Sequence, residues 1–141
     1  MQWRAAMADA RIRAVDKLRT DTFQNAYQAW TAAADIRAFC TALEQAATNG
    51  DINDSENVAR WIAWGRAAAD RIDPACGTPS LADVSFDVEP RPTDLRPFLG
   101  EWSPHRPQKE YRSERDEQAL ADTRHQAESW HHGMLGRRTW R

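Results

Sequence analysis

The residues of this chain that could carry chemistry are its histidines, its two cysteines and its carboxylates. His125, His131 and His132 lie close together near the C-terminus, and imidazole serves both as a metal ligand and as a general base. Their spacing matches neither the CxxC nor the HExxH pattern of the usual zinc sites. We therefore interpret the three histidines as incidental and expect no metal site and no cofactor.

The two cysteines are too few for a disulfide framework. Cys40 falls on an apolar helical face, which predicts a buried side chain, whereas Cys76 lies in a stretch with proline and glycine, which favours an exposed thiol. Asp70 and Asp73 flank an arginine near a predicted helix end, which indicates surface charge rather than an acid–base pair. No nucleophilic triad or glycine-rich phosphate loop is present. The sequence thus predicts no enzyme and no small-molecule substrate.

A pair of helices between residues 35 and 74 is the element around which the rest of the chain is organised, and it must position any functional residues. The apolar residues of the first helix recur at helical spacing. They are Ile36, Phe39, Cys40, Leu43 and Ala47. Gly50 predicts the end of this helix, because glycine adopts the left-handed conformation without a Cβ penalty. A short connection to the next helix favours an antiparallel hairpin.

The second helix is predicted to begin at once. Asn53 is the expected N-cap, with Glu56 three residues later in capping-box spacing, and Pro74 predicts the end near residue 73. Its apolar face consists of Val58, Trp61, Ile62, Gly65, Ala68, Ala69 and Ile72, and Trp64 widens it. We interpret both tryptophans as core residues, so that Trp61→Ala would cost about 3 kcal/mol. The alternative is that one of them is an exposed anchor for a partner. Gly65 offers a point of close approach between the helices.

Residues 2 to 34 contain neither glycine nor proline and keep an approximate helical stripe. A break at Thr20–Thr22 would divide this region into two helices. One unbroken helix running into the 36–48 segment is the alternative. The first twenty residues hold five basic and two acidic side chains, which indicates a solvated face rather than a phosphate-binding one.

The chain after residue 74 changes character. Six prolines lie between residues 79 and 107, and the alternation at Val84, Phe86 and Val88 favours either one extended strand or a segment lying in a groove. Farther on, large apolar residues have two alternative fates: folding back over the helical hairpin, or docking onto another protein. They are Leu95, Phe98, Leu99 and Trp102.

Residues 108 to 132 are dense in charge and have a thin apolar face, which predicts either a marginal helix or a segment that folds on a partner. The tail is too polar and too rich in proline to build its own core. We therefore expect any ordered tail to bury its aromatic residues against something other than itself. The candidate partner-binding residues are Trp64, Phe98, Trp102, Trp130 and Trp140.

Charge and hydropathy add two expectations. The formal net charge of −2 favours neither a nucleic-acid clamp nor an acidic mimic. No segment has the unbroken apolar run of a membrane helix, and charged residues from Arg4 to Arg13 interrupt any signal-peptide core. We expect a cytoplasmic protein without a membrane partner.

The phrases AWTAAADIRAFCTALE and ARWIAWGRAAADRIDP carry a resemblance. Together they resemble a helical segment at the C-terminal end of uncharacterised bacterial proteins, some of which look as though they begin with a helix-turn-helix-like region. That region would imply DNA association, but this chain has no equivalent of it. The matching residues are Trp30, Ile36, Arg37, Ala38, Phe39, Trp61, Trp64, Ala69, Asp70, Arg71, Ile72, Asp73 and Pro74.

The sequence therefore predicts an all-α fold. It comprises a long N-terminal helix or helix pair, an antiparallel helical hairpin, an extended proline-rich tail and a marginal C-terminal helix. Composition divides the chain into a helical domain at 1–74, an extended segment at 75–107 and a charged tail at 108–141. Two functions remain open: a non-enzymatic protein–protein interaction module, which includes self-association, and an accessory DNA-associated or regulatory factor.

Overall fold

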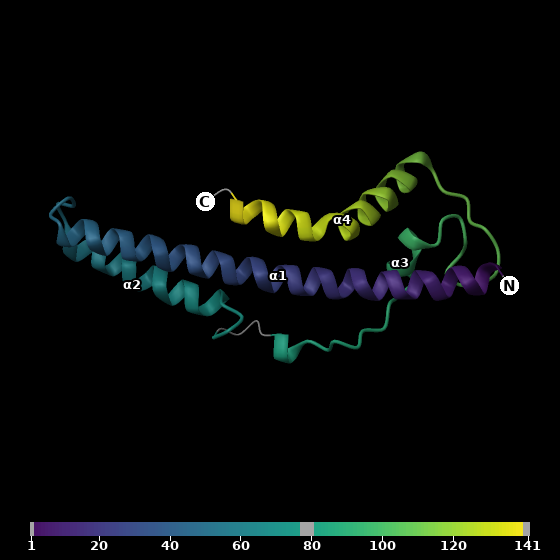
Figure 1. The fold of residues 1–141 in the computed structure, drawn as a ribbon, viewed down its shortest axis with the longest axis horizontal. Coiled ribbons are helices and arrows are strands. Elements are labelled where there is room, and N and C mark those ends of the chain that lie inside the picture. Colours follow the sequence, from purple (N-terminus) through teal and green to yellow (C-terminus); the bar gives the residue numbers. More distant parts are fainter. Residues whose placement is uncertain (1, 77–80, 140–141) are drawn as a thin grey trace. The chain divides into compact units, whose positions relative to one another are not determined.

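The computed structural model of the protein describes residues 2–76 and 81–139, and it is all-α, as predicted (Figure 1). No β-strand occurs in these residues, which hold one isolated bridge between Trp102 and Lys109. No helix among them is both long and apolar enough to cross a membrane. The elements in chain order are α1 (Gln2–Thr48), α2 (Ser55–Ile72), the 3-10 helix η1 (Leu81–Asp83), the short α3 (Pro92–Leu95), the 3-10 helix η2 (Arg96–Phe98) and α4 (Glu114–Thr139).

The N-terminal region forms one helix rather than two. α1 runs without a break through Thr20–Thr22, where a cap could have divided it, and Thr20 is buried. An uninterrupted helix is consistent with the absence of glycine and proline before Gly50, since these residues most often end a helix.

Spatial contacts divide the chain into two units, and α1 contributes to both. Asn25–Ser85 form one unit, and the residues up to Gln24 together with those from Phe86 onward form the other. The predicted boundaries at residues 74 and 107 came from composition, whereas this division follows contacts between segments far apart in the sequence.

In the unit from Asn25 to Ser85, α1 ends where Gly50 predicts the end of the helix. Gly50 has a φ of 81°, its N–H donates to the Ala47 carbonyl at 3.2 Å, and the Asp51 N–H donates to the Ala46 carbonyl at 2.9 Å. These two bonds form a Schellman motif, which satisfies carbonyls that the helix end leaves without partners. The reversal at Gly50 sends the chain back as α2, which confirms the predicted hairpin.

The start of α2 differs from the prediction by one residue. Asp54, not Asn53, is the N-cap, and its side chain accepts a hydrogen bond from the Asn57 N–H at 3.0 Å. Asn and Asp cap about equally well, so adjacent candidates cannot be ranked by type. The end is as predicted: Asp73 has an extended backbone with ψ of 116° before Pro74.

The interior of the hairpin is built from small side chains. Ala33 and Cys40 on α1 and Ile62 and Ala69 on α2 are buried, which confirms the prediction for Cys40. A Cβ built on Gly65 would lie 2.9 Å from Cys40 Sγ, a distance that real Cβ contacts do not reach. Gly65 is therefore the predicted point of close approach.

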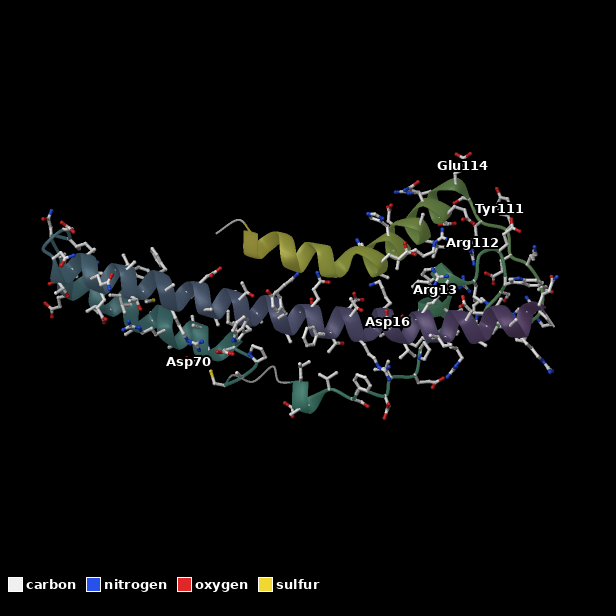
Figure 2. The ribbon with its side chains drawn as sticks, in the orientation of Figure 1. Arg13, Asp16, Asp70, Tyr111, Arg112 and Glu114 are labelled. Carbon is white, nitrogen blue, oxygen red and sulfur yellow. The ribbon has the colours of Figure 1, made fainter. Side chains whose placement is uncertain are left out.

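In the other unit, the proline-rich segment folds back onto the N-terminal part of α1. The predicted packing of this segment over the helical hairpin is therefore wrong. Phe98 is 8% exposed and packs with Ala10 and Ala14. The Arg13 guanidinium lies 4.9 Å from the centre of its ring (Figure 2). Leu95, Leu99 and the half-buried Trp102 complete this cluster. The cluster is formed with α1 before residue 25 rather than with the hairpin.

The extended strand predicted near Phe86 is wrong. Residues 81–83 form η1 instead, and Val84 and Phe86 remain exposed. Phe86 is held by one side chain: the Arg19 guanidinium lies 3.7 Å from its ring centre, and Arg19 Nε donates to its carbonyl at 2.9 Å. A lone strand has no ladder partner, so a cation–π contact takes the place of sheet pairing.

The charged tail forms a helix, which is one of its two predicted alternatives. α4 begins after Ser113, whose hydroxyl accepts a hydrogen bond from the Asp116 N–H at 3.2 Å. Tyr111 just before it is 95% exposed (Figure 2). The expectation that tail aromatics lie buried on another segment thus holds for Phe98 and in part for the half-buried Trp102, but fails for Phe86 and Tyr111.

Candidate functional site

One face of the hairpin carries ion pairs between α1 and α2. Arg66 Nη1 lies 3.1 Å from Glu44 Oε2, and Arg37 forms two ion pairs with α2, at 2.8 Å to Asp70 and 2.7 Å to Asp73. We call this side the ion-paired face. It joins the two helices at two levels and fixes their register.

The interpretation of Asp73 as a surface charge is wrong. Asp73 is 3% exposed, and it accepts hydrogen bonds from the Ala75 N–H at 2.9 Å and from Arg37 at 2.7 Å. These two bonds, the backbone one first, hold the pKa of Asp73 below its ordinary value. The sequence shows that Asp70 and Asp73 stand three residues apart and so share one helical face. It does not show that both pair with Arg37, because that residue is far away in the chain.

The charged groups of this cluster bind one another. The hydrogen bonds to Asp70 and then to Asp73 raise the pKa of the Arg37 guanidinium, and its Nη2 also donates to the exposed Cys76 Sγ at 3.5 Å. The donors of Arg37 are thus committed to the end of α2 and the turn that follows. Figure 2 shows Asp70 at that end of α2. Within the part of the chain that the structure describes, no three His, Cys, Asp or Glu side chains gather as a metal site.

The opposite side of the hairpin carries exposed aromatic residues. At about 100° per residue, Phe39 stands about 200° around α1 from Arg37, and Trp61 stands about 140° around α2 from Arg66. The two stripes adjoin, because a Cβ on Gly65 would lie 3.8 Å from Ile36 Cγ2. Gly65 shares the side of Trp61, and Ile36 shares the side of Phe39.

We call this surface the aromatic face. Its members at helical spacing are apolar, and Arg60 borders it beside Trp61 and Trp64. The members are Ala32, Ile36, Phe39, Leu43 and Ala46 on α1, and Val58, Trp61, Gly65, Ala68 and Ile72 on α2, with Trp64 at the edge.

Three large side chains project from the aromatic face. Phe39 is 64% exposed, and Trp61 and Trp64 are each 62% exposed. The two indole rings pack edge to face, with centroids 6.2 Å apart and planes at 76°. Together with Asn57 and Arg60 they line a surface hollow of about 330 Å³. Neighbouring aromatic anchors beside a hollow are typical of interface hot spots.

The interpretation of Trp61 and Trp64 as core residues is therefore wrong, and so is the prediction that Phe39 belongs to the buried face. Among the described residues of the unit from Asn25 to Ser85, α2 packs against α1 alone, so just its narrow inner stripe is covered. Ile62 and Ala69 occupy that stripe. The exposure of Trp64 agrees with its selection as a partner-binding residue, and Phe39 and Trp61 are additions that the sequence interpretation had assigned to the core.

The other candidate partner-binding residues lie elsewhere. Phe98 and Trp102 belong to the cluster on the N-terminal part of α1, so Phe98 serves packing there. The side chain of Trp130 and the whole of Trp140 lie outside the described residues, as do the side chains of His131 and His132.

A second, charged hollow of about 670 Å³ lies beside the start of α4. Its lining includes three cationic side chains, Arg96, Lys109 and Arg112, and two carboxylates, Glu110 and Asp116. Glu117 lies a further 3.9 Å from Arg112. The lining thus carries three positive charges and two negative ones, and each of its three cations lies within 4 Å of a carboxylate.

No protein-family model, curated protein or solved structure that was compared with this chain matches it.

Proposed function

We propose that this chain is a non-enzymatic protein–protein interaction module and that the aromatic face is its docking surface. One observation carries the proposal: Phe39, Trp61 and Trp64 are each more than 60% exposed on the aromatic face. Contiguous apolar patches of this kind mark interaction sites on soluble proteins.

The energetic scale is sufficient for binding. A buried aromatic side chain removes about 150–250 Å² from water, so three that are about 60% exposed present about 300–450 Å². At about 25 cal/mol per Å², covering them yields about 7–11 kcal/mol of gross hydrophobic free energy. Association costs reduce this to a smaller net value, which is still compatible with a specific complex.

The residues that carry the sequence resemblance support the same function. They fall into two groups on the hairpin: Arg37, Asp70 and Asp73 join the helices, whereas Phe39, Trp61 and Trp64 are exposed. The first group thus holds the hairpin together, and the second forms the surface that the hairpin exposes. The residues of the resemblance contain no catalytic constellation.

The alternative of a DNA-associated factor gains no comparable support. Four of the five basic side chains in the first twenty residues are paired with carboxylates, among them Arg11 with Glu89 at 2.6 Å and Lys17 with Asp21 at 2.5 Å. Arg13 and Arg19 likewise lie within 4 Å of acidic groups. Phosphate binding needs cations free to displace counterions, so we favour the protein partner.

Site-specific photo-cross-linking in the native host tests the proposal. A photoreactive phenylalanine analogue replaces Phe39 or Trp64 in one set, and Thr41 or Ala67 in a matched set. The control positions are also exposed but lie off the aromatic face. We expect discrete adducts from the first set only. Adducts of equal yield from both sets, or none from Phe39 and Trp64, would overturn the assignment.

A further inference from the structure

We infer that the partner of the aromatic face is an acidic peptide segment of another protein, and that the hollow beside Trp61 and Trp64 receives one of its carboxylates on Arg60. This inference rests on the proposed function, because it takes the aromatic face as the docking surface. It adds the chemical class of the partner, which follows from the groups that line the hollow.

The hollow is built by one stretch of α2. Its lining residues stand three or four positions apart, so their side chains adjoin on the helix surface. They are Asn57, Arg60, Trp61 and Trp64, and all four are exposed. Small-molecule sites bury about 70–90% of their ligand, which an open hollow of about 330 Å³ cannot do. A side chain of a peptide that runs across the surface needs no such enclosure, so the hollow favours a peptide.

The polar groups of the hollow are mainly hydrogen-bond donors. The guanidinium of Arg60 and the indole N–H groups of Trp61 and Trp64 only donate, and the side-chain amide of Asn57 both donates and accepts. Arg60 is the charged member of the lining. An occupant that complements these groups needs acceptor oxygens and a negative charge, and a carboxylate supplies both.

Arg60 is available for such a bond. Within the part of the chain that the structure describes, its exposed side chain forms neither an ion pair nor a hydrogen bond with another residue. Glu56 stands one helical turn earlier on α2, and it too forms no ion pair with Arg60. By contrast, Arg37 and Arg66 are bound to carboxylates of the hairpin. Arg60 is thus a cation without an internal partner beside two exposed indole rings.

The rest of the aromatic face determines what flanks the carboxylate. The rings of Trp61 and Trp64 lie edge to face with centroids 6.2 Å apart, and Phe39 on α1 is 64% exposed. Apolar side chains on either side of the carboxylate would cover these rings, and such aromatic anchors carry most of the binding free energy at interfaces. The inferred partner is therefore a segment with Asp or Glu beside apolar residues, not a polyacidic run.

Single-stranded nucleic acid also combines negative charge with rings that stack on tryptophan, but the charge around the hollow disfavours it. Asp51, Asp54 and Glu56 are exposed at the turn and in the first turn of α2, and the Asp54 side chain accepts a hydrogen bond from the Asn57 N–H. A strand carries one phosphate about every 3.4 Å, so phosphates next to the one at Arg60 would approach these carboxylates. A peptide with one carboxylate in that position avoids the repulsion.

Peptide selection against the full chain is the first test, with a phage-displayed library of random peptides as the probe. We expect the enriched sequences to share an Asp or Glu beside apolar residues. Enrichment of sequences without a carboxylate, or of none at all, overturns the inference.

Titrations with the tightest selected peptide localise the contact, and a counterpart peptide carries Asn or Gln in place of its Asp or Glu. Arg60→Gln should raise the Kd of the acidic peptide about tenfold and leave the Kd of the counterpart unchanged. Arg71→Gln removes the same charge from an exposed position of α2 outside the hollow and should change neither Kd. Trp64→Ser should weaken both peptides, because it removes an apolar contact. Circular dichroism confirms that the variants remain helical.

The control variant separates a specific contact from general charge attraction. If Arg60→Gln and Arg71→Gln weaken the acidic peptide equally, the net charge of the chain and not the hollow selects it, and the inference fails. Peptides that neither Arg60→Gln nor Trp64→Ser affects bind another surface and also overturn it. A single-stranded oligothymidine that binds more tightly than the peptide and displaces it would assign the hollow to nucleic acid instead.

The outcomes also separate this inference from the proposed function. If the selected peptides lack carboxylates but are weakened by Trp64→Ser, the aromatic face docks peptides of another chemistry, so the proposed function stands and this inference fails. If no peptide is enriched but Phe39 or Trp64 cross-links to a protein in the native host, the result is the same. If both the peptides and the cross-links are absent, both fail.

Discussion

Replacing Gly65 with alanine tests the closest approach in the hairpin. In a helix exposed to solvent the change would stabilise by about 1 kcal/mol, because glycine loses more backbone entropy than alanine. At this position the new Cβ would lie 2.9 Å from Cys40 Sγ. The Cys40 side chain is 2% exposed and donates to the Ile62 carbonyl at 3.7 Å, so it cannot move aside without losing packing.

The magnitude follows from these opposing effects. Overpacking a filled interior costs about 1–3 kcal/mol, so the net effect of Gly65→Ala should be a loss of about 1 kcal/mol. With Cys40→Ala in the background the obstructing sulfur is gone, and the same change should gain about 1 kcal/mol. The coupling between the two positions is then about 2 kcal/mol, within the range known for residues in contact.

Urea unfolding of the four proteins in this double-mutant cycle measures the coupling. Ala67→Gly, at an exposed position of the same helix, calibrates the glycine–alanine difference in situ and should cost about 1 kcal/mol. All samples are compared at one low protein concentration, because association would add to the apparent stability. A coupling below about 0.3 kcal/mol, or a stabilising Gly65→Ala in the wild-type background, would show that the helices do not approach at Gly65.

Three further predictions concern other features of the hairpin. Trp61→Ala should cost less than about 1 kcal/mol in monomer stability instead of the 3 kcal/mol of a core position, since the indole is 62% exposed. A larger loss in urea unfolding would place it in the core. Gly50→Val should cost about 1 kcal/mol or more because of its φ of 81°, with no steric contribution because nothing lies within 4 Å; Gly50→Asn is the tolerant control. Asp73→Asn should lower the thermal midpoint at neutral pH, and since the pKa of Asp73 is held below about 3.8, the difference from wild type should shrink as the pH falls below that value. A difference that is independent of pH would contradict the pairing with Arg37.

The features that sequence reasoning predicted correctly are mainly local or periodic. The turn at Gly50 and the stop before Pro74 depend on the backbone preferences of single residues. The close approach at Gly65 follows from the need for space between two helices of small residues. Helical spacing likewise identified the stripe that contains Cys40. These signals need no knowledge of distant segments.

The errors share a physical origin. Periodicity tells which residues share a face, but not whether a second element covers that face. Trp61 and Phe39 stand beside the inner stripe of a two-helix hairpin, and a third helix would be needed to bury them. The burial of Asp73 depends on Arg37, 36 residues away, and the position of Phe98 depends on Ala10 and Ala14. Such long-range pairings have no local signature.

The composition of the hairpin interior bears directly on the use of its surface. Its buried residues are mostly small: Ala33, Cys40 and Ala69. Small side chains bury little apolar area and stabilise weakly, whereas ion pairs at exposed positions contribute little. The largest apolar side chains of the same two helices lie outside that interior, on the aromatic face. Folding of the hairpin therefore leaves the apolar area of Phe39, Trp61 and Trp64 largely uncovered, and under the proposed function a partner would cover it. If the aromatic face binds a partner as proposed, binding should raise the apparent stability of the hairpin. Substitutions on that face should then lower both the affinity and the stability gained on binding.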